Sequence, residues 1–313
     1  MNRDDVSWQG YLPATVTPFT EDGDLDLGTL AELVDFYAAE GMHGVMVNGT
    51  CGEWFSQSPA ERLEVARTTV QTAAGRMTVL VGTTGYTAAE SAALARDAFA
   101  VGADGVVISP PPYVKLFPDE VEQYYRDITA LVEGPIAVYN WPHGAGIDID
   151  TELADRLADI DGIVAIKDST PNGDQFFATS RTVRDRVRVF GNYMSRRGVE
   201  ELLEHGGDGF IGGGALRGHA EPAFWDSYWA GEREPLFAYA EVADRMFERL
   251  WLPGGWAGKY GSYQAQLKEL MRMLGQPAGH VRRPRLPITR PDYLAALREV
   301  LVDEGLLEGP VPA

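Results

Sequence analysis

Short apolar runs, separated by amphipathic stretches, recur along the first two thirds of the chain. Each run has the length of a buried strand, and the next one starts about 20 to 35 residues later, which is the length of one βα unit. The pattern therefore predicts eight buried, parallel strands. These predicted strands start at Ala14, Gly44, Thr78, Gly105, Pro135, Gly162, Val187 and Asp208.

The stretches between the runs carry helix start signals. Ser58 to Glu61 and Thr87 to Glu90 both have the S/T-x-x-E spacing of a capping box. Glycines precede several predicted strands, as in EGMHGVMV and VGADGVVI, where they suit the tight turn from helix to strand. Alternating strands and helices predict an α/β fold, a (β/α)8 barrel over residues 1–221. The alternative is an open, doubly wound sheet.

After Pro222 the strand pattern stops. Helical patterns continue to about Gly305, interrupted by the irregular segments WLPGGWAGKYG and RRPRLPITRP. Residues 222–313 are therefore predicted to form a helical C-terminal extension of the barrel.

Composition narrows the possible partners and the compartment. The net charge of −19 and the pI near 4.6 argue against nucleic acid or an anionic membrane as partner, because both bind basic patches. The single cysteine, Cys51, permits no internal disulfide, and no apolar stretch approaches membrane length, so a cytoplasmic, soluble protein is expected. The five histidines show no metal-ligand spacing and there is no dinucleotide fingerprint, so neither a metal nor a cofactor is implied.

A lysine stands at the end of the predicted strand GIVAIK. The chain has only four lysines among its 27 basic residues, and Lys167 is the one placed where a buried strand ends. Unlike arginine, a buried lysine can lose its proton and attack a carbonyl group. The alternative is a lysine whose amine reaches solvent at the strand end.

One βα unit before Lys167, a tyrosine ends the preceding predicted strand. In a barrel, chemistry takes place where the strands meet the following helices, so Tyr139 and Lys167 are expected to project toward a common centre. A tyrosine beside a neutral lysine can transfer protons during imine formation. On its own, Tyr139 would be read as a packing residue.

The segment NGTCGEW follows the second predicted strand. Its glycines let the backbone turn N–H groups inward, and Thr50 and Cys51 add small polar side chains. Such a turn can bind a carboxylate.

These motifs together resemble the dihydrodipicolinate synthase and N-acetylneuraminate lyase family. Gly49 to Glu53 is similar to its G-[TS]-x-G-E signature, and Tyr139 to Pro142 followed by Lys167 is similar to its second signature. Pro111 to Tyr113 falls where the family has a tyrosine that reaches the neighbouring subunit's site. Gly279 to Thr289 resembles its C-terminal G-x-V-R-x-P-L segment.

The resemblance covers nearly the whole chain and implies a class I, Schiff-base lyase without a cofactor. It implies a homotetramer built as a dimer of dimers, with a homodimer as the alternative. By this resemblance Lys167 forms an imine with pyruvate or another 2-oxo acid and Tyr139 transfers protons, with Thr50 and Tyr113 as hydroxyl relay. The remaining implied contacts are those of Thr50 and Cys51 with the substrate carboxylate, and of Ile211 with the pocket wall.

Three departures from the family pattern bear on the substrate. Gly144 stands where dihydrodipicolinate synthases have an arginine that binds the amino-acid substrate, and Cys51 replaces a hydroxyl residue. Prolines precede a single tyrosine at Tyr113, where the family often has two. Trp141 and His143 are then expected at the pocket entrance, in contact with the second substrate half.

The loop GGGALRG after the last predicted strand offers one further cation. Arg217 could swing into the pocket and supply the charge missing at Gly144. The loop also lies where barrels often bind phosphate, although its glycines are equally explained by close packing.

The favoured function is an aldolase acting on a 2-oxo acid through a lysine imine. The enzymatic alternatives are a dehydratase of a 3-deoxy-2-oxo sugar acid, which would use the same lysine, and dihydrodipicolinate synthase itself. A non-enzymatic alternative is an inactive sensor of 2-oxo acids, which would be expected to lack Lys167 or its relay.

Overall fold

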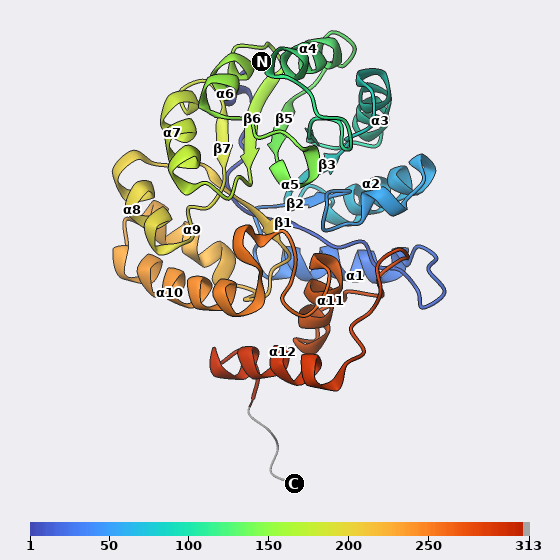
Figure 1. Ribbon diagram of the computed structural model, residues 1–313, viewed down its shortest axis with the longest axis vertical. Coiled ribbons are helices and arrows are strands. Elements are labelled where there is room, and N and C mark those ends of the chain that lie inside the picture. Colours follow the sequence, from blue (N-terminus) through green and yellow to red (C-terminus); the bar gives the residue numbers. More distant parts are fainter. Residues whose placement is uncertain (309–313) are drawn as a thin grey trace.

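The computed structural model shows a closed barrel of eight parallel strands in sequential order, and it describes residues 1–308. Figure 1 shows the helices arranged around this barrel. The fold predicted from the sequence is confirmed, and the open sheet is excluded. The strands are β1 (Gly10–Ala14), β2 (Gly44–Val47), β3 (Thr78–Gly82), β4 (Gly105–Ile108), β5 (Ile136–Asn140), β6 (Ile163–Asp168), β7 (Arg188–Phe190) and β8 (Gly209–Gly213).

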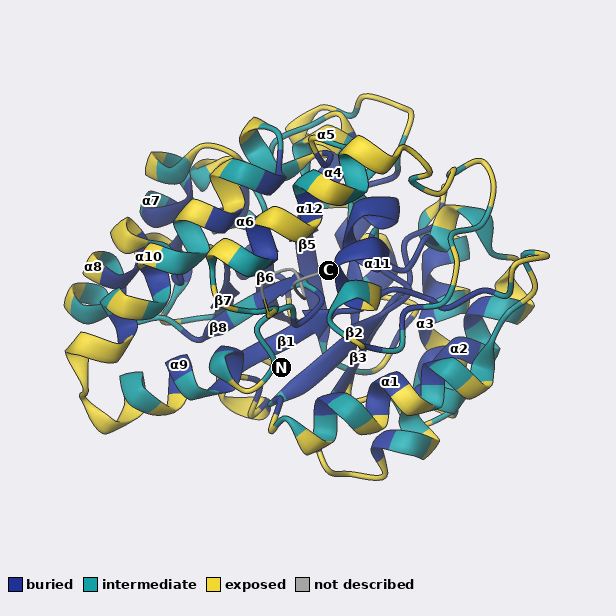
Figure 2. Ribbon diagram, turned by 90° about the horizontal axis from the view of Figure 1, so that it is seen from below, coloured by how far each residue is buried: buried dark blue, intermediate teal, exposed yellow. Residues whose placement is uncertain are grey.

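The helices cover the barrel with one buried face each. Figure 2 shows buried strands inside and helices whose exposed sides face outward. A short helix, α5 (Pro142–Ala145), adds a turn directly after β5. The barrel helices are α1 (Leu27–Ala39), α2 (Pro59–Ala73), α3 (Ala88–Ala100), α4 (Pro118–Thr129), α6 (Thr151–Ala158), α7 (Gly173–Val183), α8 (Arg196–His205) and α9 (Ala220–Ala230).

The first strand lies earlier than the sequence predicts. β1 ends at Ala14, where the predicted strand begins. It pairs with β8 along its whole length but with β2 only through Ala14 and Met46. Pro13, which has no N–H to donate, is tolerated because one side of this strand is almost unpaired. The prediction was wrong because a Gly-Tyr-Leu-Pro run lacks the usual composition of a strand.

Both predicted helix caps are present. At α2 the Glu61 N–H donates to the Ser58 hydroxyl, and the Ser58 N–H donates to the Glu61 carboxylate. At α3 the Glu90 N–H donates to the Thr87 hydroxyl, but the Glu90 carboxylate accepts from the N–H of Tyr86 instead. Each cap satisfies backbone donors that a helix start leaves free.

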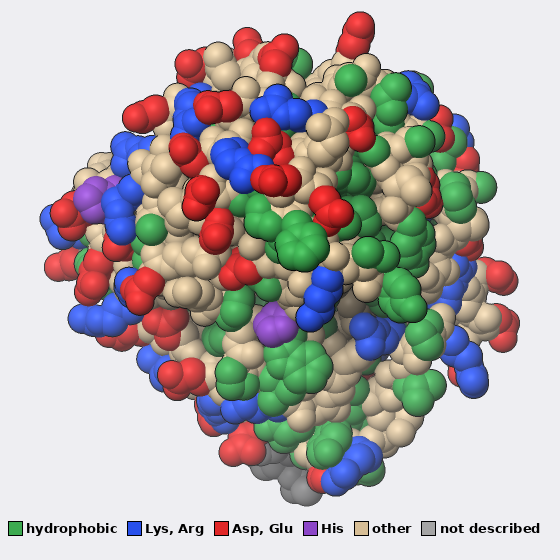
Figure 3. All heavy atoms as spheres, turned by 45° about the horizontal axis from the view of Figure 1, so that its top comes forward, with side chains coloured by type: hydrophobic (Ala, Val, Ile, Leu, Met, Phe, Trp, Pro, Cys, Tyr) green, Lys and Arg blue, Asp and Glu red, His purple; other side chains and the backbone are tan. Residues whose placement is uncertain are grey.

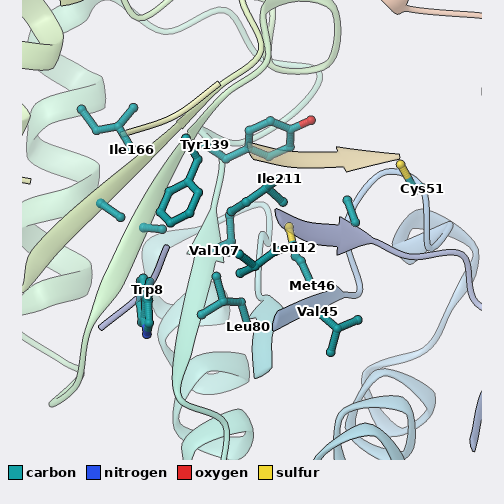
Figure 4. Close-up of a cluster of buried hydrophobic side chains, with 14 of the residues drawn as sticks. Trp8, Leu12, Val45, Met46, Cys51, Leu80, Val107, Tyr139, Ile166 and Ile211 are labelled. Carbon is teal, nitrogen blue, oxygen red and sulfur yellow. The ribbon is translucent and has the colours of Figure 1, made fainter. Parts of the chain in front are cut away.

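Apolar side chains fill the barrel below its carboxyl end. Leu12, Leu80 and Ile211 are buried in this interior, and Trp8 closes the amino end against Gly105. A Cβ atom at Gly105 would lie 2.2 Å from the Trp8 ring, so a larger residue would not fit there. Figure 4 shows Trp8 at one end of the cluster and Cys51 toward the other. The interior is therefore a packed core, and the open space lies at the carboxyl ends of the strands.

The C-terminal part of the chain is helical. It consists of α10 (Arg233–Leu250), α11 (Tyr263–Met273) and α12 (Pro291–Asp303), which lie on one side of the barrel (Figure 1). The predicted start at 222 falls inside α9, the barrel helix that packs on β1. No helix within residues 1–308 is long and apolar enough to cross a membrane.

Candidate active site

Lys167 and Tyr139 meet at the carboxyl end of the barrel. They are register partners on β6 and β5, and the Lys167 Nζ lies 3.5 Å from the centroid of the Tyr139 ring. The amine donates to the Ser169 hydroxyl at 3.0 Å. Only 5% of Lys167 is exposed, so the alternative in which its amine reaches solvent does not hold.

Burial changes the protonation of Lys167. Desolvation lowers the pKa of its amine to about 7, against the smaller, opposing effects of Cys51 and Asp168. At neutral pH a large fraction of the amine is therefore unprotonated, whereas a solvated lysine with a pKa near 10.4 is almost entirely charged. A neutral amine in a dry site can attack a carbonyl carbon.

Tyr139 is a buried phenol that keeps its proton. Burial raises its pKa well above the usual value, and the Thr50 and Ser169 side chains lie close enough to oppose this rise. Its ring stacks with Trp141, with centroids 6.4 Å apart and planes 13° apart. The protonated phenol beside the amine is placed to give and take protons.

The loop after β2 has free N–H groups at the barrel mouth. Its two ends, Asn48 and Glu53, adopt left-handed backbone angles (φ 55° and 54°), which fold the loop inward. Within residues 1–308, no backbone carbonyl or other side chain accepts from the N–H groups of Thr50 or Cys51. Burial raises the pKa of the Cys51 thiol to about 11, so it stays neutral. The loop presents donors for an anion.

Helix α11 and the segment after it anchor this loop. The Gln264 side chain donates to the Thr50 carbonyl at 2.9 Å, and one turn later the Lys268 ammonium pairs with the Glu53 carboxylate at 2.7 Å. The N–H of Arg282 donates to the same carboxylate at 3.1 Å. Burial lowers the pKa of Lys268 to about 8, and Glu53 opposes that shift. The glutamate of the G-T-C-G-E motif is therefore a structural anchor.

A cavity of about 450 Å3 opens between this loop and the ends of β5, β6 and β8. Figure 4 shows Cys51, Tyr139 and Ile211 toward this end of the barrel. The predicted site residues that line the cavity are Thr50, Cys51, Tyr139, Trp141, Lys167 and Ile211.

Trp141 occupies the space that a side chain at Gly144 would need. A Cβ atom at Gly144 would lie 2.0 Å from the Trp141 ring. The loop as folded here therefore has no room for a larger side chain at position 144. His143 is exposed outside the cavity lining, with its ring 6.5 Å from that of Trp256, and its contact with substrate stays a prediction.

Two other predicted residues lie outside the cavity. Tyr113 is 95% exposed and has a positive φ of 82°. Arg217 donates to the Tyr239 carbonyl at 3.0 Å, and its guanidinium lies 4.0 Å from the centroid of the Tyr239 ring. In this arrangement Arg217 does not supply the missing charge.

The sequence patterns do not point to two polar residues of the cavity wall. Arg197, at the start of α8, lines the cavity, pairs with Asp174 and lies 5.0 Å from the centroid of the Phe177 ring. Tyr263 enters from α11, far along the chain. Arg197 lies seven residues beyond the end of β7, inside α8, and Tyr263 follows no strand, whereas strand ends were the signal that identified the other site residues.

Fold and site together define a class of protein. A closed barrel of eight parallel strands, with a buried and partly neutral lysine beside a tyrosine at the strand ends, has the groups that imine formation with a carbonyl substrate requires. The chain belongs to the dihydrodipicolinate synthetase family, whose model matches residues 7–301. Members of this family are Schiff-base lyases, so the chain is an enzyme of that class.

Curated relatives match along nearly the full chain. An uncharacterized DapA-like lyase of Rhizobium meliloti is 31% identical over 300 residues, which cover 95% of this chain and 96% of the relative. The 4-hydroxy-tetrahydrodipicolinate synthase of Moorella thermoacetica is 31% identical over 298 residues, which cover 94% and 99%.

Solved structures share the fold. YagE, a prophage protein of the family from E. coli K12 in complex with pyruvate, has a TM-score of 0.85 at 27% identity. Dihydrodipicolinate synthase from Acinetobacter baumannii, also complexed with pyruvate, has a TM-score of 0.84 at 26% identity. Both matches cover 96% of this chain and 100% of the other.

Proposed function

We propose that this enzyme is a class I aldolase that makes or breaks a carbon–carbon bond in a 2-oxo acid held as an imine on Lys167. The observation that carries the proposal is the burial of the Lys167 amine against the Tyr139 ring, with its pKa lowered to about 7. Pyruvate is the simplest substrate of this kind, and it is the ligand named for YagE and for the Acinetobacter enzyme.

The site residues fit the steps of this reaction. The neutral Lys167 amine attacks the C2 carbonyl, Tyr139 gives a proton to the carbonyl oxygen, and water leaves to form a protonated imine. When the bond between C3 and C4 breaks, the C4 hydroxyl gives its proton to the Tyr139 phenolate, C4 leaves as an aldehyde, and the imine accepts the electron pair of the broken bond and becomes an enamine. The N–H groups of Thr50 and Cys51 hold the carboxylate at C1 throughout.

The other substrate half differs from that of the synthases. With Trp141 filling the place of a side chain at Gly144, the loop offers no guanidinium to bind an amino-acid carboxylate. The cavity lining also contains several aromatic side chains. Its members include Trp141, Phe177 and Phe247, with Arg197 among the polar residues. We therefore propose an acceptor other than aspartate semialdehyde, with a hydroxylated or aromatic distal half.

Association of copies is part of the proposal. Tyr113 lies on a surface segment that also exposes Val114 and Phe117, at 54% and 75%. Figure 3 shows hydrophobic side chains gathered on one side of a face whose other side is mostly charged. Exposed apolar residues of this size are typical of an interface, so Tyr113 would complete a neighbouring site in a homodimer or homotetramer.

Reductive trapping tests the proposal. Pyruvate and borohydride should add one pyruvate-derived mass to the protein, located on Lys167 by peptide mapping. Lys167→Gln should abolish the adduct, whereas Lys259→Gln, which alters an exposed lysine outside the cavity, should leave it intact. An adduct on another lysine, or none with any 2-oxo acid, would contradict the mechanism.

A coupled assay tests the second substrate. Turnover of pyruvate with aspartate semialdehyde should be poor beside that of the Moorella synthase under the same conditions. Comparable turnover would show that the lack of an arginine at position 144 does not exclude aspartate semialdehyde as a substrate. Release of pyruvate from 4-hydroxy-2-oxo acids should identify aldol cleavage, whereas a dehydratase would retain the whole carbon chain.

A further inference from the structure

Tyr263 places an unused phenol at the mouth of the barrel. The residue begins α11, outside the barrel proper, yet it lines the cavity together with Cys51 and Lys167. Its ring stacks on Trp251 with centroids 4.3 Å apart and planes 20° apart, which fixes its direction. Tyr263 is partly buried, and within residues 1–308 its hydroxyl forms no hydrogen bond, so it is free to bind a ligand in the cavity.

The position of this hydroxyl follows from its contacts. A Cβ atom at Gly213 would lie 2.1 Å from the Tyr263 oxygen, so the hydroxyl sits directly over the end of β8. Gly213 pairs with Ala14 on β1, and Ala14 pairs with Met46 on β2, just before the loop that carries Thr50. Ala14, at the end of β1 between these strands, has a short side chain that lines the cavity. The Tyr263 phenol, over the end of β8, and the loop after β2 therefore lie on opposite sides of the end of β1.

The backbone links Tyr263 to the same loop. The next residue, Gln264, donates to the Thr50 carbonyl at 2.9 Å, so the start of α11 cannot move independently of the loop. Burial raises the pKa of the Tyr263 phenol, and the nearby Cys51 and Tyr139 raise it further. The phenol therefore keeps its proton at neutral pH and can donate a hydrogen bond.

The loop alone offers a carboxylate few donors. Two backbone N–H groups, of Thr50 and Cys51, are free, the Thr50 hydroxyl interacts with the Tyr139 phenol, and the Cys51 thiol is neutral and a weak donor. A buried carboxylate needs more partners than this, because each ionised oxygen left unpaired is costly. A phenol is a much stronger donor than a thiol.

We propose that the Tyr263 hydroxyl donates a hydrogen bond to the carboxylate of the 2-oxo acid and so takes the place of a hydroxyl side chain at Cys51. This inference rests on the proposed imine at Lys167. It makes Tyr263 a substrate-binding residue supplied by the C-terminal extension, with a ring that stacks on Trp251 and an oxygen that lies over Gly213.

Tyr263→Phe tests the inference because it keeps the stacked ring and removes only the oxygen. The pyruvate concentration for half-maximal borohydride trapping at Lys167 should rise about tenfold to a hundredfold, the usual effect of one hydrogen bond to a charged group. The maximal amount of adduct should not change. With pyruvamide, the neutral amide of pyruvate, the variant and the wild-type protein should differ by a smaller factor, about twofold to tenfold, because a hydrogen bond to a neutral acceptor contributes less than one to a carboxylate.

The matched control is Tyr260→Phe, which removes a phenol from the same extension, outside the cavity. It should trap pyruvate like the wild-type protein. An unchanged half-maximal concentration for Tyr263→Phe, or an equal shift with pyruvamide, would overturn this inference while leaving the imine at Lys167 standing. Failure of the wild-type protein to form an adduct would overturn both.

Discussion

Lys167 and Tyr139 face each other as register partners, with the lysine Nζ 3.5 Å from the centre of the tyrosine ring. A ring face attracts an ammonium ion and would by itself favour the charged amine. Desolvation is nevertheless the largest effect on the pKa of Lys167 and lowers it to about 7. The pair therefore holds an amine that is poised between its charged and its nucleophilic form.

The first prediction concerns pH. Protonated Lys167 cannot attack a carbonyl, so imine formation with pyruvate should rise about tenfold per pH unit below pH 7 and level off above it. The rate of adduct formation between pH 5.5 and 9 measures this. A solvated amine would instead keep gaining rate up to about pH 10.

A neighbouring carboxyl needs a control in this experiment. Burial raises the pKa of Asp168 to about 7 as well. Its Oδ1 accepts from Asn140 and from the N–H of Thr170, while its Oδ2 has no partner, so Asp168→Asn can keep these bonds. The inflection near pH 7 should persist in this variant, and its loss would assign the titration to Asp168.

The second prediction concerns Tyr139. Tyr139→Phe should keep the ring over Lys167 but slow turnover by about 10² to 10⁴, the usual contribution of a positioned proton-transfer group. Circular dichroism and the melting temperature, measured beside the kinetics, should stay close to wild type. Loss of activity through unfolding would favour a packing role instead.

The third prediction concerns the loop after β5. Gly144→Ala should lower the free energy of unfolding by about 1–3 kcal/mol, because the new methyl group overlaps the Trp141 ring. Gly28→Ala, at the exposed start of α1, is the control, since its Cβ would meet no atom closer than 3.5 Å. Urea unfolding compares the two. Equal, small effects would mean that Trp141 moves aside readily.

The fourth prediction concerns the buried ion pair. Lys268→Met should destabilise the protein by about 3–5 kcal/mol because it leaves the Glu53 carboxylate buried without its cation. The double variant Glu53→Gln/Lys268→Met should cost less than the sum of the two single substitutions. Additive costs would show that the two charges act independently.

An exposed pair provides the comparison. Arg290 and Asp292 form an ion pair in which both side chains are 60% exposed. Arg290→Met should leave the unfolding midpoint nearly unchanged, because solvent screens such a pair.

The spacing of apolar runs predicted most of the strands, and the residues at the strand ends predicted the centre of the site. Seven of the strands start within one residue of their predicted positions, and Lys167 meets Tyr139 because neighbouring parallel strands end at the same edge. These features depend on local patterns of apolar residues, which a sequence shows directly. The exception is β1, whose almost unpaired side accommodates a proline that strand patterns exclude.

Other parts of the site depend on contacts between distant segments. Nothing near Gly144 in the sequence shows that Trp141 fills its space, and nothing near Tyr263 shows that α11 reaches the barrel mouth. The family motif includes Glu53 but does not say what this residue does. Its ion pair with Lys268 shows that it anchors the loop. Long-range packing of this kind has no periodic signature.

The anchoring of the loop after β2 by α11 has a consequence for the order in which the enzyme becomes active. A ribosome releases Tyr139 and Lys167 well before it releases Gln264 and Lys268, which hold the loop of Thr50. A growing chain therefore contains the Lys167 amine before it contains the residues that anchor the carboxylate-binding loop. Catalysis in such an enzyme therefore requires synthesis to have passed Lys268.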